Sequence, residues 1–140
     1  MLSRHIFREY DIRGVTGTDL TPEVAGLVAR AYAAFLASKG VSGEIVVGRD
    51  NRPSGNALHE AFVAGLLDCG LDVVDIGVVP TPLVYWAQHK LGVAGGIQIT
   101  GSHNPPEFNG FKLGLANHSV YGADIQRIYE LAVAGNFPNG

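Results

Sequence analysis

Ile97-Gln98-Ile99-Thr100-Gly101-Ser102-His103-Asn104-Pro105-Pro106 is the stretch around which the whole chain is organised. Its first half is apolar and favours a β-strand, and its second half consists of turn residues, so Ser102 lies where a buried strand ends and a loop begins. Gly101 leaves the backbone uncrowded and free to adopt a positive φ. Pro105 and Pro106 prevent a helix from starting at once. The sequence therefore predicts that Ser102 is presented to a cleft and is not packed into a core.

Upstream of this stretch, short apolar strands alternate with amphipathic helices. The expected strands cover residues 44–49, 71–79 and 94–100, and the expected helices cover residues 21–40, 54–70 and 81–92. Thr21 and Ser54 are the predicted N-caps of the first two helices. This alternation is typical of βαβ units. It predicts an α/β fold with three α/β/α layers around a mostly parallel mixed sheet.

The flanking segments complete the sheet. Residues 6–14 predict a strand with four charged side chains, which is either a solvated edge strand or one that delivers Arg8 or Arg13 to a ligand. Residues 101–108, here called the serine loop, separate the strand at 94–100 from residues 109–115. This connection is too short for a crossover helix, so the strand at 109–115 is expected to run antiparallel. A last helix places Ile125, Ile128 and Ala132 on one face. Residues 1–140 are thus expected to form one domain.

The composition narrows the class of protein. With 46% hydrophobic residues and a net charge of −3, the chain is not of the disordered type, and it is not expected to bind nucleic acid or an anionic membrane. No apolar run reaches the roughly 18 residues of a transmembrane helix, and the first residues do not resemble a signal peptide. The single cysteine, Cys69, is predicted to be a small core residue. These features favour a cytoplasmic protein.

The predicted carboxyl ends of the parallel strands gather cationic residues near Ser102. In open α/β sheets, ligands bind at this edge. Arg49 ends one strand and Arg52 follows it, Lys112 lies on the strand that returns from the serine loop, and Arg13 lies near the end of the charged first segment. An exposed serine surrounded by cations is typical of a site for a phosphate group.

Other chemistries fit this sequence less well. Asn104 stands where the nucleophile elbow Gly-x-Ser-x-Gly has its second glycine, and His103 is too close in sequence to accept the proton of Ser102, which argues against a serine hydrolase. No Gly-x-Gly-x-x-Gly or Gly-x-x-x-x-Gly-Lys-Ser/Thr motif follows a strand. No cluster of Asp, Glu, His and Cys has the spacing of a self-contained metal site.

Four motifs in this order resemble the α-D-phosphohexomutases, and most closely the N-terminal phosphoserine domain of the bacterial phosphomannomutase/phosphoglucomutases. They are Phe7-Arg8-Glu9-Tyr10-Asp11-Ile12-Arg13-Gly14, Val47-Gly48-Arg49-Asp50-Asn51-Arg52, Pro80-Thr81-Pro82, and Thr100-Gly101-Ser102-His103-Asn104-Pro105 followed by Asn109-Gly110-Phe111-Lys112. The motifs extend over most of the chain.

The resemblance implies a phosphoryl-transfer role for Ser102. As a phosphoserine, Ser102 would give its phosphoryl group to a hexose monophosphate and form a bisphosphate, so that phosphate moves between the 1- and 6-positions of glucose or mannose. Arg13 and Lys112 would contact the transferring group, and His103 would act as a hydrogen-bond partner or in proton transfer. The phosphate on Ser102 would also coordinate Mg²⁺. The implied substrate contacts are Tyr10, Arg8 and Asn104.

The resemblance covers only the first of several domains that surround one cleft in this family. The remaining Mg²⁺ ligands and the site for the substrate's distal phosphate would lie in the other domains. Residues 1–140 alone are therefore expected to be inactive as a mutase. The expected partners are a phosphorylated hexose and the other domains of the same protein. Two alternatives remain open, a phosphoglucosamine mutase domain and a non-catalytic phosphosugar-binding module.

Overall fold

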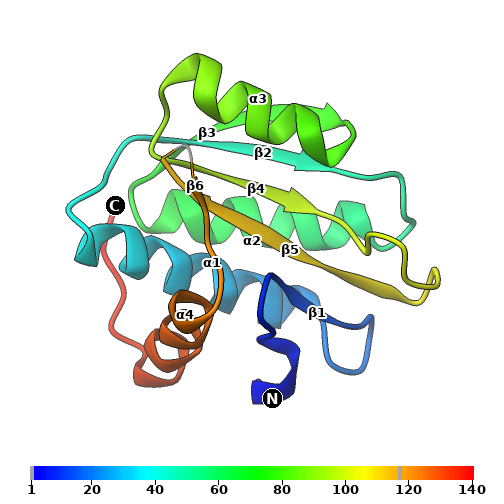
Figure 1. Ribbon diagram of the computed structural model, residues 1–140. Coiled ribbons are helices and arrows are strands. Elements are labelled where there is room, and N and C mark those ends of the chain that lie inside the picture. Colours follow the sequence, from blue (N-terminus) through cyan, green and yellow to red (C-terminus); the bar gives the residue numbers. More distant parts are fainter. Residues whose placement is uncertain (1, 117) are drawn as a thin grey trace.

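The computed structural model describes residues 2–116 and 118–140. Six strands form one sheet, in which the order is β1-β5-β4-β2-β3 and β6 lies beside β5 (Figure 1). In chain order the elements are the 3₁₀ helix Arg4–Ile6, β1 Ile12–Val15, α1 Pro22–Ser38, β2 Glu44–Arg49, α2 Gly55–Asp68, β3 Asp72–Val78, α3 Thr81–Leu91, β4 Gly95–Ile99, β5 Phe108–Leu115, β6 His118–Ser119 and α4 Ala123–Ala134.

The strand directions confirm the predicted mixed sheet. β2 pairs in parallel with β3 on one side and with β4 on the other. β5, which follows the serine loop, pairs antiparallel with β4, β1 and β6. Within the described chain, β5 is therefore the strand that runs against the others, as the short connection after the serine loop predicts.

Helices cover the two faces of the sheet unequally. α1 and α2 pack on one face, where Ile97, Phe111 and Leu113 join the main core, and α4 lies against α1 (Figure 1). α3 lies on the opposite face and packs on β2 and β4, with a small second core that includes Val46 and Val84. The predicted three-layer arrangement is confirmed, and the layer formed by α3 is the thinner one.

The two predicted helix caps have different outcomes. The Thr21 side chain accepts a hydrogen bond from the Val24 backbone N–H at 3.2 Å, which confirms the N-cap of α1. Ser54 also precedes its helix, but its side chain makes no cap hydrogen bond. Its hydroxyl instead accepts from Asn109 Nδ2 at 2.8 Å. The cap prediction for Ser54 is therefore wrong, and this side chain ties the start of α2 to β5.

The predicted strand over residues 6–14 is correct only in its last part. β1 begins at Ile12, while residues 8–11 form a turn in which the Arg8 N–H donates to the Asp11 carbonyl at 2.9 Å. Phe7 and Ile12 face each other across this turn in an antiparallel bridge. A continuous strand would send neighbouring apolar residues to opposite faces, whereas the turn buries Ile6, Phe7 and Ile12 together.

Two smaller expectations concern Cys69 and membranes. Cys69 directly follows α2 and is buried in the main core, as predicted, and desolvation by burial raises the pKa of its thiol. Among the described residues, no helix combines the length and the apolar character that a membrane span requires.

Tyr32 supplies a pH-dependent test of the core. Its side chain is fully buried, and its hydroxyl donates to the carbonyls of Gly114 and Gly96 between α1 and the sheet. Burial raises its pKa well above the ordinary value of 10.0. Because the folded protein then holds this proton more tightly than the unfolded chain does, the stabilising contribution is complete below pH about 10 and is lost as the pH rises above it.

We expect the stability advantage of the wild-type protein over Tyr32→Phe to shrink above pH about 10, by up to about 1.4 kcal/mol per pH unit. Denaturant unfolding over a pH series measures both free energies of unfolding. Tyr121→Phe is the matched control, because Tyr121 is 59% exposed and lies outside the buried core. Parallel pH curves for the wild type and Tyr32→Phe would contradict the prediction.

Candidate active site

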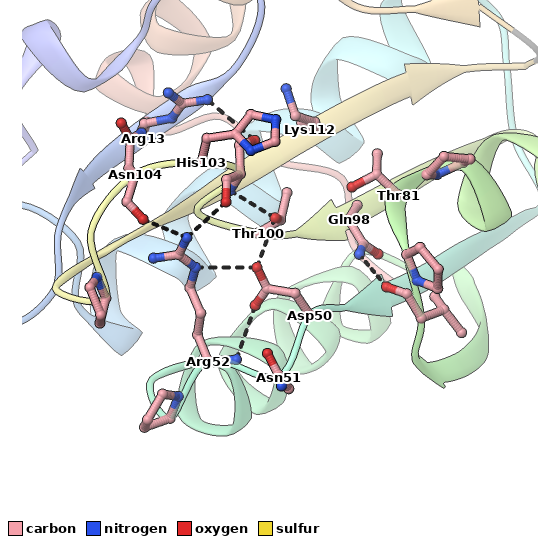
Figure 2. A pocket seen from close by; sticks show the side chains of 16 residues that line it. Arg13, Asp50, Asn51, Arg52, Thr81, Gln98, Thr100, His103, Asn104 and Lys112 are labelled. Atoms are coloured by element: carbon pink, nitrogen blue, oxygen red, sulfur yellow. Dashed lines mark hydrogen bonds and ion pairs between the residues drawn. The ribbon is translucent and has the colours of Figure 1, made fainter.

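An open cavity of about 930 Å³ lies at the carboxyl ends of β2 and β4, next to the start of α3. The residues around it come from the loop after β2 (50–53), the segment that leads into α3 (79–82), the serine loop after β4, and strands β1, β4 and β5 (Figure 2). This is the edge of the sheet where the strand pattern predicts a ligand site.

The alternation of side chains along the strands explains why this cavity is polar. Gln98 of β4 lies opposite Lys112 of β5, and Arg13 of β1 lies opposite Gly110, two positions along β5. These side chains therefore project from the face of the sheet that carries α3. Because α3 packs on β2 and β4, the neighbouring part of that face stays open, and Lys112 and Arg13 line the cavity.

The backbone of Ser102 is fixed from both sides. Ser102 has a φ of 54°, in the left-handed region that a residue with a Cβ rarely adopts. Its N–H donates to Thr100 Oγ1 at 2.9 Å, and its carbonyl accepts from Arg52 Nη2 at 2.9 Å. These two hydrogen bonds hold the unusual conformation, and the half-buried serine side chain lines the cavity.

Position 101 requires glycine because a larger side chain would not fit there. The φ of Gly101 is not positive, and the positive φ is found at Ser102 instead. A Cβ added at Gly101 would overlap the guanidinium of Arg52, which packs directly against the loop. The expectation of an uncrowded backbone at Gly101 is therefore wrong, because the space that the glycine leaves is filled by an arginine.

Arg52 supports the serine loop and is not positioned as the phosphate-binding cation that the sequence predicts. Its Nη1 donates to the carbonyls of Pro105 at 2.6 Å and Phe108 at 3.0 Å, and its Nη2 donates to those of Ser102 and Asn104, the latter at 2.7 Å. Its Nε also contacts Asp50 Oδ2 at 3.3 Å. With these donors engaged by the loop, little of this guanidinium is left for a ligand.

Arg49 is also turned away from the serine. Its Nη1 lies 3.9 Å from Asp75 Oδ1 of β3, and Arg49 is absent from the cavity lining. Arg13 and Lys112 are thus the cations with which the described structure surrounds Ser102.

Asp50 is a residue that the sequence analysis did not single out. Its Oδ2 accepts from Thr100 Oγ1 at 2.8 Å, and its Oδ1 accepts from the Arg52 N–H at 3.1 Å (Figure 2). The same Oδ2 also accepts from the Gly101 N–H at 3.2 Å. Thr100 in turn accepts from the N–H of Ser102. An acidic residue directly after a buried parallel strand is a signal that could have identified Asp50 as part of the site.

The side chain of Ser102 faces a cation. Arg13 Nη2 donates to Ser102 Oγ at 3.4 Å, and the amide oxygen of Asn104, turned toward the guanidinium, accepts from Arg13 Nε at 3.0 Å. Arg13 also donates to the carboxylate of Asp11, whose Oδ2 lies 3.6 Å from Lys112 Nζ. A guanidinium stays protonated and does not act as a base, so this environment suits a negatively charged group on Ser102 better than a deprotonation of its hydroxyl.

The remaining predicted site residues divide into two groups. His103 is exposed and lines the cavity beside Ser102, together with Asn104 (Figure 2). Arg8 and Tyr10 are exposed on the turn before β1 and do not line the cavity, and the Tyr10 ring lies 6.4 Å from that of Tyr121. The substrate contacts expected of Arg8 and Tyr10 stay predictions.

The described residues do not by themselves fit a magnesium site. They contain no group of three or more His, Cys, Asp or Glu side chains that could hold a metal ion. The two nearby carboxylates are engaged elsewhere, Asp50 by the serine loop and Asp11 by Arg13 and Lys112. The expectation that a phosphate on Ser102 coordinates Mg²⁺ stays a prediction.

Comparisons with known proteins agree on one family. Residues 4–138 match the model of the phosphoglucomutase/phosphomannomutase alpha/beta/alpha domain I. The phosphomannomutase/phosphoglucomutase of Pseudomonas aeruginosa is 42% identical over 139 residues, which are 99% of this chain and 30% of that protein. A probable phosphoglucosamine mutase of Thermococcus kodakarensis is 42% identical over 127 residues, or 90% of this chain and 27% of that protein. The chain thus spans less than a third of the length of these relatives.

A solved structure supports the same assignment. The crystal structure of a phosphoglucomutase/phosphomannomutase family protein from Burkholderia thailandensis superimposes with a TM-score of 0.94 at 42% identity, covering 100% of this chain and 32% of that one.

The support that Arg52 gives to the serine loop is testable by an exchange of one cation for another. We expect Arg52→Lys to lower the free energy of unfolding by about 2–4 kcal/mol, because an ammonium group cannot reach the same four carbonyls. Denaturant unfolding measures the loss, and hydrogen exchange of the amides in residues 100–108 localises it.

Arg49→Lys is the matched control, since Arg49 makes a single long ion pair with a partly exposed carboxylate. Its expected cost is below about 1 kcal/mol. Equal stabilities and equal loop exchange in the two variants would show that the Arg52 hydrogen bonds do not hold the loop.

Proposed function

Because the chain belongs to the phosphoglucomutase/phosphomannomutase family as its alpha/beta/alpha domain I, we propose that it is the phosphoserine-bearing domain of a phosphohexomutase. The enzyme would interconvert hexose 1-phosphates and hexose 6-phosphates. The observation that carries this proposal is the position of Ser102, held at a φ of 54° at the cavity with Arg13 Nη2 at 3.4 Å from its Oγ.

The charges around Ser102 support a phosphorylated resting form. A phosphoserine carries a charge of about −1.5 to −2 at neutral pH and needs cationic or hydrogen-bonding partners. Arg13 and Lys112 both line the cavity, and Arg13 already contacts the serine oxygen. A planar guanidinium can hold two phosphate oxygens at once, and an ammonium group adds a point charge.

The proposed step moves a phosphoryl group between two oxygens. The bond between phosphorus and Ser102 Oγ breaks while a bond to a hydroxyl oxygen of the hexose monophosphate forms, and the hydroxyl proton ends on Ser102 Oγ. A hexose bisphosphate results, and the reverse step on its other phosphate returns a phosphoryl group to Ser102. Such transfer depends mainly on positioning and charge stabilisation. His103, exposed beside Ser102 in the cavity, is our candidate for carrying the proton.

The rest of the reaction would need parts of the protein outside this chain. The chain spans 30% of the length of the Pseudomonas relative, and its described residues contain no metal-binding group. We therefore propose that further domains hold Mg²⁺ together with the Ser102 phosphate, bind the distal phosphate of the substrate, and make this chain active. A cytoplasmic location, favoured by the composition, is part of the same proposal.

The sugar is the open part of this proposal. The probable phosphoglucosamine mutase of Thermococcus kodakarensis is as identical to this chain as the Pseudomonas phosphomannomutase/phosphoglucomutase is, at 42%. A phosphoglucosamine mutase is therefore the second candidate. Turnover of the whole protein with glucose 1-phosphate, mannose 1-phosphate and glucosamine 6-phosphate distinguishes the two.

We expect Ser102→Ala in the whole protein to lower mutase turnover by about 10³-fold or more, because the phosphoryl acceptor is lost. Phosphopeptide mapping of the wild-type protein should find phosphate on Ser102. Ser119→Ala, on the exposed strand β6, is the control and should retain wild-type activity. An unmodified wild-type Ser102, with turnover unaffected by the alanine, would instead favour a non-catalytic phosphosugar-binding module.

We also expect residues 1–140 alone to show no measurable mutase turnover with a hexose monophosphate and its bisphosphate. The fragment would lack the groups that the proposed further domains supply, and circular dichroism checks that the fragment is folded. Turnover at a rate near that of the whole protein would contradict this expectation.

A further inference from the structure

Asp11 is a nearly buried carboxylate that the proposed reaction does not use. Its side chain is 7% exposed and lies at the end of the turn before β1, where the backbone is fixed by the Arg8–Asp11 hydrogen bond. A buried charge is costly unless it is paired. Asp11 is paired with Arg13 and Lys112, two cations that line the cavity together with Ser102.

Asp11 and Ser102 both accept a hydrogen bond from the same guanidinium nitrogen of Arg13. Arg13 Nη2 donates both to Asp11 Oδ2 and, at 3.4 Å, to Ser102 Oγ. Lys112 Nζ lies 3.6 Å from the same Asp11 oxygen, and among the described residues Lys112 forms no other ion pair. Asn104 can also accept from Arg13, but its amide is neutral. Any phosphate on Ser102 would therefore meet cations that already have an anionic partner.

The balance of charge changes when Ser102 is phosphorylated. Arg13, Lys112 and Asp11 together carry a net charge of +1, whereas the two cations alone would carry +2. A phosphoserine of about −2 would be neutralised completely without Asp11 but only partly with it. Asp11 also gives Arg13 and Lys112 a partner when the phosphate has left, so that the cations stay beside Ser102.

We propose that Asp11 is a positioning residue whose carboxylate competes with the Ser102 phosphate for Arg13 and Lys112, and so keeps the phosphoserine ready to transfer its phosphoryl group. This inference rests on the proposed function. The competition lowers the stability of the phosphoserine relative to a bisphosphate in the cleft, and it prevents the two cations from trapping the phosphate.

The proposal is tested in the whole protein by measuring how the phosphoryl group is distributed at equilibrium between Ser102 and the sugar phosphate. Phosphorylated protein is mixed with glucose 6-phosphate, and dephosphorylated protein with glucose 1,6-bisphosphate, until both mixtures give the same phosphorylated fraction by mass spectrometry. We expect Asp11→Asn to shift this equilibrium toward the phosphoserine by about tenfold, because a charge is removed close to the phosphate while the shape is kept. A purely structural role for Asp11 would shift it the other way, since misplaced cations hold the phosphate less well.

Two further variants keep the test decisive. Asp11→Ser also removes the charge and keeps a hydrogen-bonding side chain, so a folding defect in one Asp11 variant leaves the other to decide. Glu9→Gln removes an exposed charge from the same turn and should leave the equilibrium unchanged. An unshifted equilibrium, or one shifted toward the dephosphorylated form, in a folded Asp11 variant would overturn the inference. If the wild-type Ser102 accepts no phosphate at all, the proposed function fails instead.

Discussion

The hydrogen bonds from Arg52 to four backbone carbonyls of the serine loop are the interaction on which the site depends. Three of these carbonyls, those of Ser102, Asn104 and Pro105, lie between β4 and β5, and the fourth belongs to Phe108 at the start of β5. One guanidinium gives all four a hydrogen-bond donor and at the same time neutralises Asp50, which holds Thr100 and the Gly101 N–H. The position of the serine thus follows from groups that lie behind the loop and not in front of it.

The unequal covering of the sheet explains why the site lies where it does. The main core on the side of α1 and α2 supplies most of the buried apolar surface, so the other face needs only a short helix over β2 and β4. Strands β5 and β1 extend beyond α3 and present charged side chains on that face. Lys112 and Arg13 can occupy strand positions there because their charged ends reach the cavity.

The hydrophobic periodicity and the order of strands and helices were sufficient to predict the fold, whereas the individual polar contacts could not be predicted from the sequence. Alternating strands and helices give the α/β fold, the reversed strand β5 and the edge where Ser102 meets Lys112 and Arg13. The strand prediction over residues 6–14 was partly wrong because charged residues in a tight turn have a sequence pattern similar to that of an edge strand. The role of Arg52 could not be seen, because a cation near a serine has the same sequence pattern whether it faces a ligand or the loop's own carbonyls. Asp11 was missed because its burial depends on that unrecognised turn.

The left-handed backbone at Ser102 has a consequence for how function and fold can separate in this family of sequences. Asparagine, aspartate and glycine tolerate a positive φ better than serine does, so a chain that replaces Ser102 with one of them would keep the loop without added backbone strain. Neither solubility nor melting temperature would then reveal the loss of the proposed phosphoryl acceptor. Within such sequences, the identity of this one side chain is more informative about chemistry than the overall degree of similarity.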